Sequence, residues 1–164
     1  MADKPTIYLE TTIPSFLTAR PSGDLIAAGE QETTRKWWET RRGDFNLFVS
    51  DLVLAEAARG DASAAQRRLE TLKDLPLLAA DDEVDALTQA ILKSGVIPAK
   101  AATDAAHVAI AARHGMDVLM TWNCKHIANA ELLFRMAEVV ARAGYRLPVI
   151  CTPRELMGGL DHDA

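Results

Sequence analysis

The chain has 164 residues, of which 49% are hydrophobic and 25% are charged, and its formal net charge is -5. This length is typical of one folded domain, and the composition excludes both a disordered chain and a membrane-spanning one. The negative charge argues against a protein that coats nucleic acid through long-range attraction, because that binding mode depends on many Lys and Arg residues. It does not exclude an enzyme that acts on nucleic acid, since a site built from carboxylates can itself be acidic.

Short apolar runs predict five buried strands. In chain order they are Thr6–Leu9, Asn46–Val49, Leu77–Ala79, Asp117–Met120 and Pro148–Ile150. Six other segments have helical periodicity, each near a signal that can end a helix, such as a glycine. These segments are Leu25–Thr40, Leu52–Arg59, Ala62–Leu72, Glu83–Lys93, Ala101–His114 and Ala130–Ala143. Strands that alternate with helices predict an α/β fold in which helices cover both faces of a central parallel sheet.

No internal repeat or linker-like run divides the chain, so we expect one three-layer α/β/α domain over residues 1–157. The remaining residues, 158–164, are expected to form a flexible tail. Within the predicted helix Ala101–His114, a stripe of mostly alanine residues recurs at the spacing of a buried face. Such small side chains allow the helix to lie close to its neighbours, which would hold Asp104 in a fixed position near the helix start.

Polar residues follow the predicted strands, at the edge of a parallel sheet where ligands usually bind. These residues are Glu10-Thr11-Thr12 after the first strand, Ser50-Asp51 after the second and Thr121-Trp122-Asn123 after the fourth. The ordinary explanation for such residues is helix capping, which we favour for Ser50 and Asp51. Glutamate is not a favoured capping residue, and Thr11 or Thr12 could cap in its place. The carboxylate of Glu10 therefore needs another role.

Two further acids, Glu56 and Asp104, lie among apolar residues. A buried carboxylate is costly unless it is paired or binds a metal ion, so both are candidates for a site. The alternatives are an ion pair between Glu56 and Arg59, and capping of its own helix by Asp104. These two acids, Glu10 and Asn123 all lie at or near a strand exit or a helix start, where one crevice could gather them.

Three carboxylates and one amide suit a hard, oxygen-seeking cation such as Mg²⁺ or Mn²⁺. Such an ion can activate a water for attack on a phosphodiester and can neutralise the charge that develops on the phosphate. The cluster therefore predicts a hydrolytic nuclease. No glycine-rich phosphate-binding loop occurs in the sequence, which removes the usual nucleotide-binding interpretations of an α/β domain.

Four segments carry a more specific pattern, namely Ile7–Thr12, Val49–Glu56, Thr103–Ala109 and Asp117–Asn123. Their order and spacing resemble the PIN-domain family, and within it the VapC-type toxins of bacterial type II toxin–antitoxin systems. The resemblance extends over residues 7–153 and implies a PIN-like nuclease domain. It also implies metal-dependent cleavage of RNA, a homodimer, and inhibition by a small antitoxin that covers the active-site groove.

The resemblance implies a set of catalytic and metal-binding residues, which are Glu10, Glu56, Asp104 and Asn123. The supporting residues that it implies are Thr11 and Thr121. Glu10 stands where the family usually has Asp and reaches one methylene further, which a metal ion can absorb by shifting. Asn123 stands where another Asp is common, and it removes a full negative charge. Two alternatives stay open: an endoribonuclease with a weaker metal site, and a non-catalytic PIN-like module that binds protein or RNA.

The cysteines and the start of the sequence indicate a cytoplasmic protein with reduced thiols. The residues before Glu10 leave no room for the hydrophobic core of a signal peptide. Cys124 and Cys151 fit neither a disulfide framework nor a structural zinc site, which normally has four ligands. The segment Cys124-Lys125-His126 together with Cys151 offers only a weak zinc alternative, because its two halves are far apart and too few ligands are present.

Two other features have ordinary interpretations. His107, three residues after Asp104, could touch the site, but we favour a histidine that is packed and hydrogen-bonded beside its helix. The segment Arg35–Arg42 contains four basic residues, Trp37 and Trp38. We interpret it as a solvated helix face with one tryptophan turned inward, and contact with RNA or dimerisation is the alternative.

Overall fold

The computed structural model describes residues 3–158 and confirms an α/β fold around one five-stranded sheet. The strands are β1 (Thr6–Leu9), β2 (Asn46–Ser50), β3 (Leu77–Leu78), β4 (Val118–Met120) and β5 (Val149–Cys151). Their order across the sheet is β3-β2-β1-β4-β5, and every neighbouring pair is parallel. The central strand β1 is flanked on both sides, and its last three residues are fully buried.

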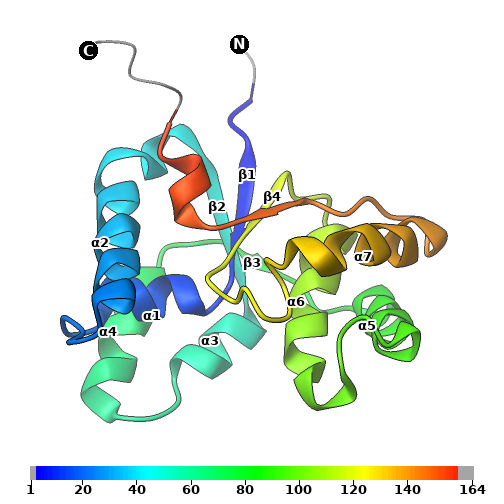
Figure 1. Ribbon diagram of the computed structural model, residues 1–164, viewed down its shortest axis with the longest axis horizontal. Helices are drawn as coiled ribbons and strands as arrows, with labels where there is room; N and C mark the ends of the chain where they lie inside the picture. Colours follow the sequence, from blue (N-terminus) through cyan, green and yellow to red (C-terminus); the bar gives the residue numbers. More distant parts are fainter. Residues whose placement is uncertain (1–2, 159–164) are drawn as a thin grey trace.

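Seven α-helices connect these strands in the part of the chain that the structure describes. They are α1 (Thr12–Thr18), α2 (Leu25–Thr40), α3 (Asp51–Ala57), α4 (Ala62–Leu72), α5 (Asp82–Ser94), α6 (Ala102–Arg113) and α7 (Ala130–Arg142). Short 3-10 turns are η1 (Arg42–Asp44), η2 (Ala99–Ala101) and η3 (Pro153–Leu156). Helices α1 to α4 contact one another on one side of the sheet, and α5 packs against α6 and α7 on the other (Figure 1). The three predicted layers are therefore present.

The predicted elements all form, and no boundary differs from the predicted one by more than two residues. Helix α1 was not predicted. It begins with two β-branched residues and has Pro14 in its first turn, and β-branched residues and proline both lower helix propensity. Proline is tolerated there because the first N–H groups of a helix have no partner within the helix. Apart from Gly158, the predicted tail lies outside the described residues.

The alanine-rich helix α6 is buried along most of its length, as its spacing predicts. Of the predicted stripe, Ala105, Val108, Ala109 and Ala112 are buried, and Ala101 just before the helix is half-buried. Helix α5 packs closely against α6. Within residues 3–158, no helix combines the length and apolar character needed to cross a membrane.

The sheet topology brings the carboxyl ends of β1, β2 and β4 to one edge. Leu9 at the end of β1 pairs with Met120 at the end of β4, and Tyr8 pairs with Phe48 in β2. The chain builds outward from β1 in one direction through β2 and β3, and in the other through β4 and β5. The strand order therefore reverses between β1 and β4, which is the position where open α/β sheets form a ligand crevice.

Candidate functional site

Glu10 lies directly at this reversal point, between β1 and α1. Its side chain is only 4% exposed, and its Oε1 accepts three hydrogen bonds. The donors are Thr12 N at 3.2 Å, Thr12 Oγ1 at 2.5 Å and Thr121 Oγ1 at 2.6 Å. Thr11 occupies the N-cap position of α1 but makes no side-chain cap, so Glu10 and not a threonine receives the N–H group at the helix start.

Glu56 reaches the same edge from α3. Its Oε1 accepts hydrogen bonds from Thr11 Oγ1, at 2.7 Å, and from His107 Nε2. Arg59, the predicted ion-pair partner, makes no salt bridge with Glu56 in the described part of the chain and acts on it only through its charge. Burial raises the pKa of Glu56, but the hydrogen bonds from His107 and Thr11 outweigh burial, so the net pKa is lowered. Glu56 is therefore ionised near neutral pH.

His107 connects Glu56 to the core of the domain. The ring lies on α6, is fully buried, and has its Nδ1 2.7 Å from the hydroxyl of Tyr8. The Tyr8 hydroxyl is in turn 2.8 Å from Ser50 Oγ. The histidine is packed and hydrogen-bonded, as the sequence interpretation favours, and it also contacts a predicted site residue.

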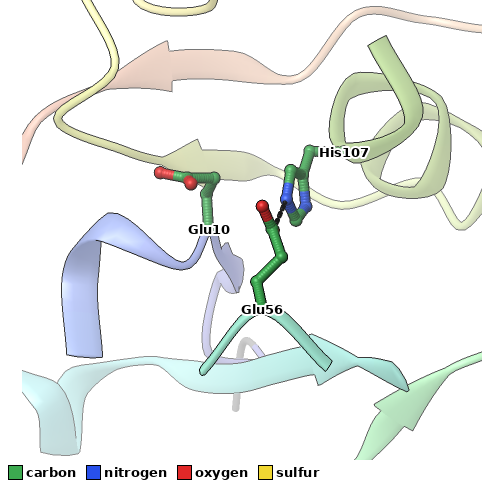
Figure 2. A group of neighbouring side chains, drawn as sticks. All are labelled: Glu10, Glu56 and His107. Carbon is green, nitrogen blue, oxygen red and sulfur yellow. Dashed lines mark hydrogen bonds and ion pairs between the residues drawn. The ribbon is translucent and has the colours of Figure 1, made fainter. Parts of the chain in front are cut away.

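Glu10, Glu56 and His107 form the group in the described residues that can hold a metal ion. One ligand atom from each lies within 4.8 Å of the other two, and Figure 2 shows Glu56 and His107 joined by their hydrogen bond, with Glu10 beside this pair. In both glutamates every hydrogen bond falls on Oε1, so Oε2 receives none from residues 3–158. Two buried or half-buried carboxylates with free oxygens fit a divalent cation, since oxygen ligands suit Mg²⁺ and Mn²⁺.

Asp104 and Asn123 both contact a different residue, His126. Asp104, in the first turn of α6, has its Oδ2 2.9 Å from His126 Nδ1. Asn123 Oδ1 accepts a hydrogen bond from the backbone N–H of His126 at 3.0 Å. The amide thus closes the turn that carries His126. Asp104 is one helical turn before His107, so the group around His126 adjoins the two glutamates without being part of the three-residue group.

The family of the chain follows from comparison with known proteins. The PIN-domain model matches residues 25–131, well over half of the chain. The chain belongs to the PIN-domain family. One solved structure with this fold is VapBC2 from Rickettsia felis bound to a DNA fragment from their promoter, with 15% identity and a TM-score of 0.57. The alignment covers 90% of this chain and 98% of that chain, and it supports the fold. No curated protein matches the sequence.

The matched span of the PIN domain contains Glu56, Asp104 and Asn123 but begins after Glu10. The geometry alone therefore places Glu10 next to Glu56. The two threonines predicted to support the site are bound to these two glutamates: Thr11 donates to Glu56 and Thr121 donates to Glu10. Each hydroxyl fixes one carboxylate oxygen and leaves the other oxygen open.

Several residues of this PIN-domain site were missed in the sequence, namely Tyr8, Thr12, Ser50 as a partner of Tyr8, and His126. Tyr8 carried a usable signal, because a tyrosine inside an apolar strand needs a hydrogen-bond partner for its hydroxyl. Thr12 stands next to a candidate acid but was considered only as a cap. His126 carried no signal beyond the weak zinc alternative, because its pairing with Asp104 joins two segments that are 22 residues apart.

The remaining features of the PIN domain have structural explanations. Trp37 is the tryptophan that turns inward, and Arg42 lies 3.9 Å above the ring of Trp38. Cys124 and Cys151 are free thiols, and burial raises the pKa of Cys151 to about 12. No group of three metal-binding side chains forms around these cysteines within residues 3–158, which gives the zinc alternative no support.

Proposed function

We propose that this PIN domain is an endoribonuclease that depends on Mg²⁺ or Mn²⁺ and acts as the toxin of a type II toxin–antitoxin pair. The observation that carries the proposal is the arrangement of Glu10 and Glu56. Each has one oxygen held by hydrogen-bond donors and a second oxygen without a donor in the described chain. A negative charge kept at a buried position in this way is costly unless a cation shares it.

In this proposal, Glu10 and Glu56 would hold the cation. Asp104 would also bind the cation, and Asn123 would bind it directly or through water. Thr11 and Thr121 would hold the two glutamate side chains in place. A bound Mg²⁺ or Mn²⁺ supplies an activated water and stabilises the charge on the phosphate during hydrolysis. The side chains of the protein contribute orientation, since their hydrogen bonds fix the carboxylates before substrate binds.

An aromatic pair beside Glu10 supports a nucleic-acid substrate. Trp122 donates its backbone N–H to Thr12 Oγ1, the same hydroxyl that binds Glu10. Its indole is fixed by a hydrogen bond from Nε1 to Thr34 and is stacked on Phe16 at 5.9 Å. Both rings are half-buried and keep some exposed surface. Fixed aromatic rings beside a phosphate-binding site favour single-stranded nucleic acid, whose bases are free to stack.

The proposed partners are an RNA substrate, a second copy of the chain and a small antitoxin, and the proposed location is the cytoplasm. The VapBC2 neighbour supports an antitoxin partner. The exposed apolar side chains of Leu25, Ile26 and Phe134, which are 87%, 73% and 83% exposed, provide surface for such contacts. Light scattering of the isolated chain tests the homodimer, and a single-chain mass at high micromolar concentration would contradict it.

A second candidate function is a non-catalytic PIN-like module that binds protein or RNA. Two observations favour it: Asn123 supplies no charge, and Asp104 is paired with His126. In this alternative the glutamates and His107 only stabilise the groove. Cleavage of RNA that depends on added metal distinguishes the two functions.

The decisive experiment measures cleavage of a labelled single-stranded RNA with Mn²⁺, with Mg²⁺ and with a chelator. We expect cleavage with either metal and none with the chelator. Glu10→Gln, Glu56→Gln and Asp104→Asn should each lower the rate by at least about 100-fold, since metal-assisted charge stabilisation contributes several kcal/mol. Each change keeps the shape of the side chain and removes its charge.

The matched control is Asp117→Asn, because Asp117 is an acid beside a threonine at the opposite edge of the sheet. It should cleave like the parent. RNA binding without cleavage in every metal condition would favour the binding module. Equal losses in the control and the site variants would show that the losses come from folding, which circular dichroism checks independently.

A further inference from the structure

A buried chain of hydrogen bonds leads from the end of β2 to Glu56. The backbone N–H of Val53 donates to Ser50 Oγ at 3.3 Å, and Ser50 Oγ lies 2.8 Å from the Tyr8 hydroxyl. That hydroxyl lies 2.7 Å from His107 Nδ1, and His107 Nε2 contacts Glu56 Oε1. Ser50, Tyr8 and His107 are all 0% exposed, so none of them is in contact with bulk water.

Only one placement of the hydrogen atoms in this hydrogen-bond network gives every donor an acceptor. Glu56 is ionised and can only accept, so His107 Nε2 must carry a hydrogen and donate it. If Nδ1 accepts from Tyr8, then Tyr8 accepts from the Ser50 hydroxyl and Ser50 accepts from Val53 N–H. Every donor and every acceptor in the chain then has a partner.

The opposite direction fails at Ser50. If His107 Nδ1 carried a hydrogen, it would donate to Tyr8, and the Tyr8 hydroxyl would donate to Ser50 Oγ. The Ser50 hydroxyl hydrogen would then have no acceptor, because Ser50 contacts only Tyr8 and Val53 N in the described chain. A buried donor without an acceptor is destabilising. Burial also raises the pKa of Tyr8, so its hydroxyl keeps the hydrogen that it donates.

We propose that Tyr8 and His107 are positioning residues: the hydrogen bond between the Tyr8 hydroxyl and His107 Nδ1 holds the ring with Nε2 directed at Glu56, and this contact orients Glu56 for the cation. The proposal rests on the metal-binding function proposed above and adds two residues to it. His107 and Thr11 both donate to Oε1 of Glu56, and this leaves Oε2 as the oxygen available to a cation. Buried residues of the core thus fix the side-chain rotamer of Glu56, a proposed metal ligand at the carboxyl edge of the sheet.

The expected effect is a change in metal affinity. Groups that orient a metal ligand typically contribute 10–100-fold to affinity or activity. Tyr8→Phe removes only the hydroxyl that His107 Nδ1 needs as a donor and keeps the ring and its packing. We therefore expect the dissociation constant for Mn²⁺ to rise by about 10-fold or more in this variant. Tyr145→Phe is the matched control, because it also removes one hydroxyl, which donates only to Glu83 at 3.3 Å.

The first measurement is ¹⁵N NMR of the histidine side chains in the full, metal-free chain. The His107 signals are assigned by their loss in His107→Gln. We expect a protonated Nε2 and an unprotonated Nδ1 in the parent, and a mixture of tautomers in Tyr8→Phe. A hydrogen on Nδ1 in the parent would overturn the proposal without any variant, so the test holds even if Tyr8→Phe does not fold.

The second measurement is calorimetric titration with Mn²⁺ of the parent, Tyr8→Phe and Tyr145→Phe. His107→Gln, which keeps a donor for Glu56, should bind more tightly than His107→Leu, which keeps only bulk. Equal affinities of the parent and Tyr8→Phe would overturn the positioning role. A parent that binds no Mn²⁺ would overturn the proposed metal site and with it this role. The two failures are thus distinguishable.

Discussion

The two edges of the sheet each hold an acid bound by a threonine, but only one edge forms a candidate site. At the amino edge, Asp117 Oδ2 accepts from Thr6 N at 2.8 Å and from Thr6 Oγ1 at 3.0 Å. Its Oδ1 lies 3.9 Å from Arg146, and the side chain is 50% exposed. At the carboxyl edge, Glu10 and Glu56 also accept from threonines, but their second oxygens have no partner in the described chain.

This difference shows what separates a structural acid from a candidate ligand. Asp117 uses both oxygens within the fold and is half in water, so its charge is satisfied. Glu10 is 4% exposed, and its Oε2 receives no hydrogen bond from residues 3–158, so the fold alone does not satisfy this carboxyl group. A carboxyl group bound by a threonine occurs at both edges, and burial and the unused oxygen make the distinction.

The largest contrast in stability should come from alanine substitutions at the two edges. Glu10→Ala leaves the three donors on Thr12 and Thr121 without an acceptor at a buried position, which should cost about 2–4 kcal/mol. Asp117→Ala leaves its donors near water and should cost about 1 kcal/mol or less. Urea unfolding in a chelator measures both, and equal costs at the two edges would break the comparison.

Substitutions of Asn123 should have smaller effects, and they test whether this residue belongs to the candidate site at the carboxyl edge. Asn123→Ala removes the acceptor for His126 N–H and should cost about 1 kcal/mol, as loss of a cap does. Asn123→Asp keeps that acceptor and adds a charge beside the glutamates. It should lower the Mn²⁺ dissociation constant, by about tenfold for each 1.4 kcal/mol gained.

Calorimetric titration of Asn123→Asp with Mn²⁺ checks this expectation, with thermal melts in chelator as the stability measurement. Unchanged affinity and unchanged melting would show that Asn123 only closes its turn. The proposed metal site would then consist of Glu10, Glu56 and Asp104.

The smallest effect is the dependence of stability on pH. Hydrogen bonds from Thr6 N–H and its hydroxyl hold the pKa of Asp117 below its ordinary 3.8. Burial raises the pKa of Glu56, but its bonds from His107 and Thr11 bring the net value below its ordinary 4.5. A lowered pKa stabilises the fold above the ordinary value, and this contribution is lost as pH falls through the folded-state pKa.

The parent should therefore lose stability on acidification more steeply than either charge-neutral variant. The difference should begin below pH 4.5 for Glu56→Gln and below pH 3.8 for Asp117→Asn. Urea unfolding at a series of acidic pH values measures the two slopes. A parent and variants with parallel slopes would show that neither carboxyl gains its hydrogen bonds on folding.

Local sequence pattern determined the elements and much of the candidate site. The alternation of apolar runs with helical periodicity predicted all five strands and six of the seven helices, because burial imposes a period on each segment independently. It missed the short helix α1, because Pro14 lowers the helix propensity of this segment. The rule that ligands lie at the carboxyl edge of parallel strands singled out Glu10, and the apolar surroundings of Glu56 made it a second candidate. The two side chains do lie close together.

Tertiary structure decided which partners these side chains take. Asp104 and Asn123 also lie near a helix start or a strand exit, yet they contact His126 instead of joining the glutamates. His107 binds Glu56 and Tyr8, which are 51 and 99 residues away. A hydrogen bond depends on the rotamers and packing of two segments at once, whereas periodicity reports only whether one segment is buried. The sequence therefore determined where the polar groups gather, and only the packed fold determined which oxygen of each carboxylate stays free.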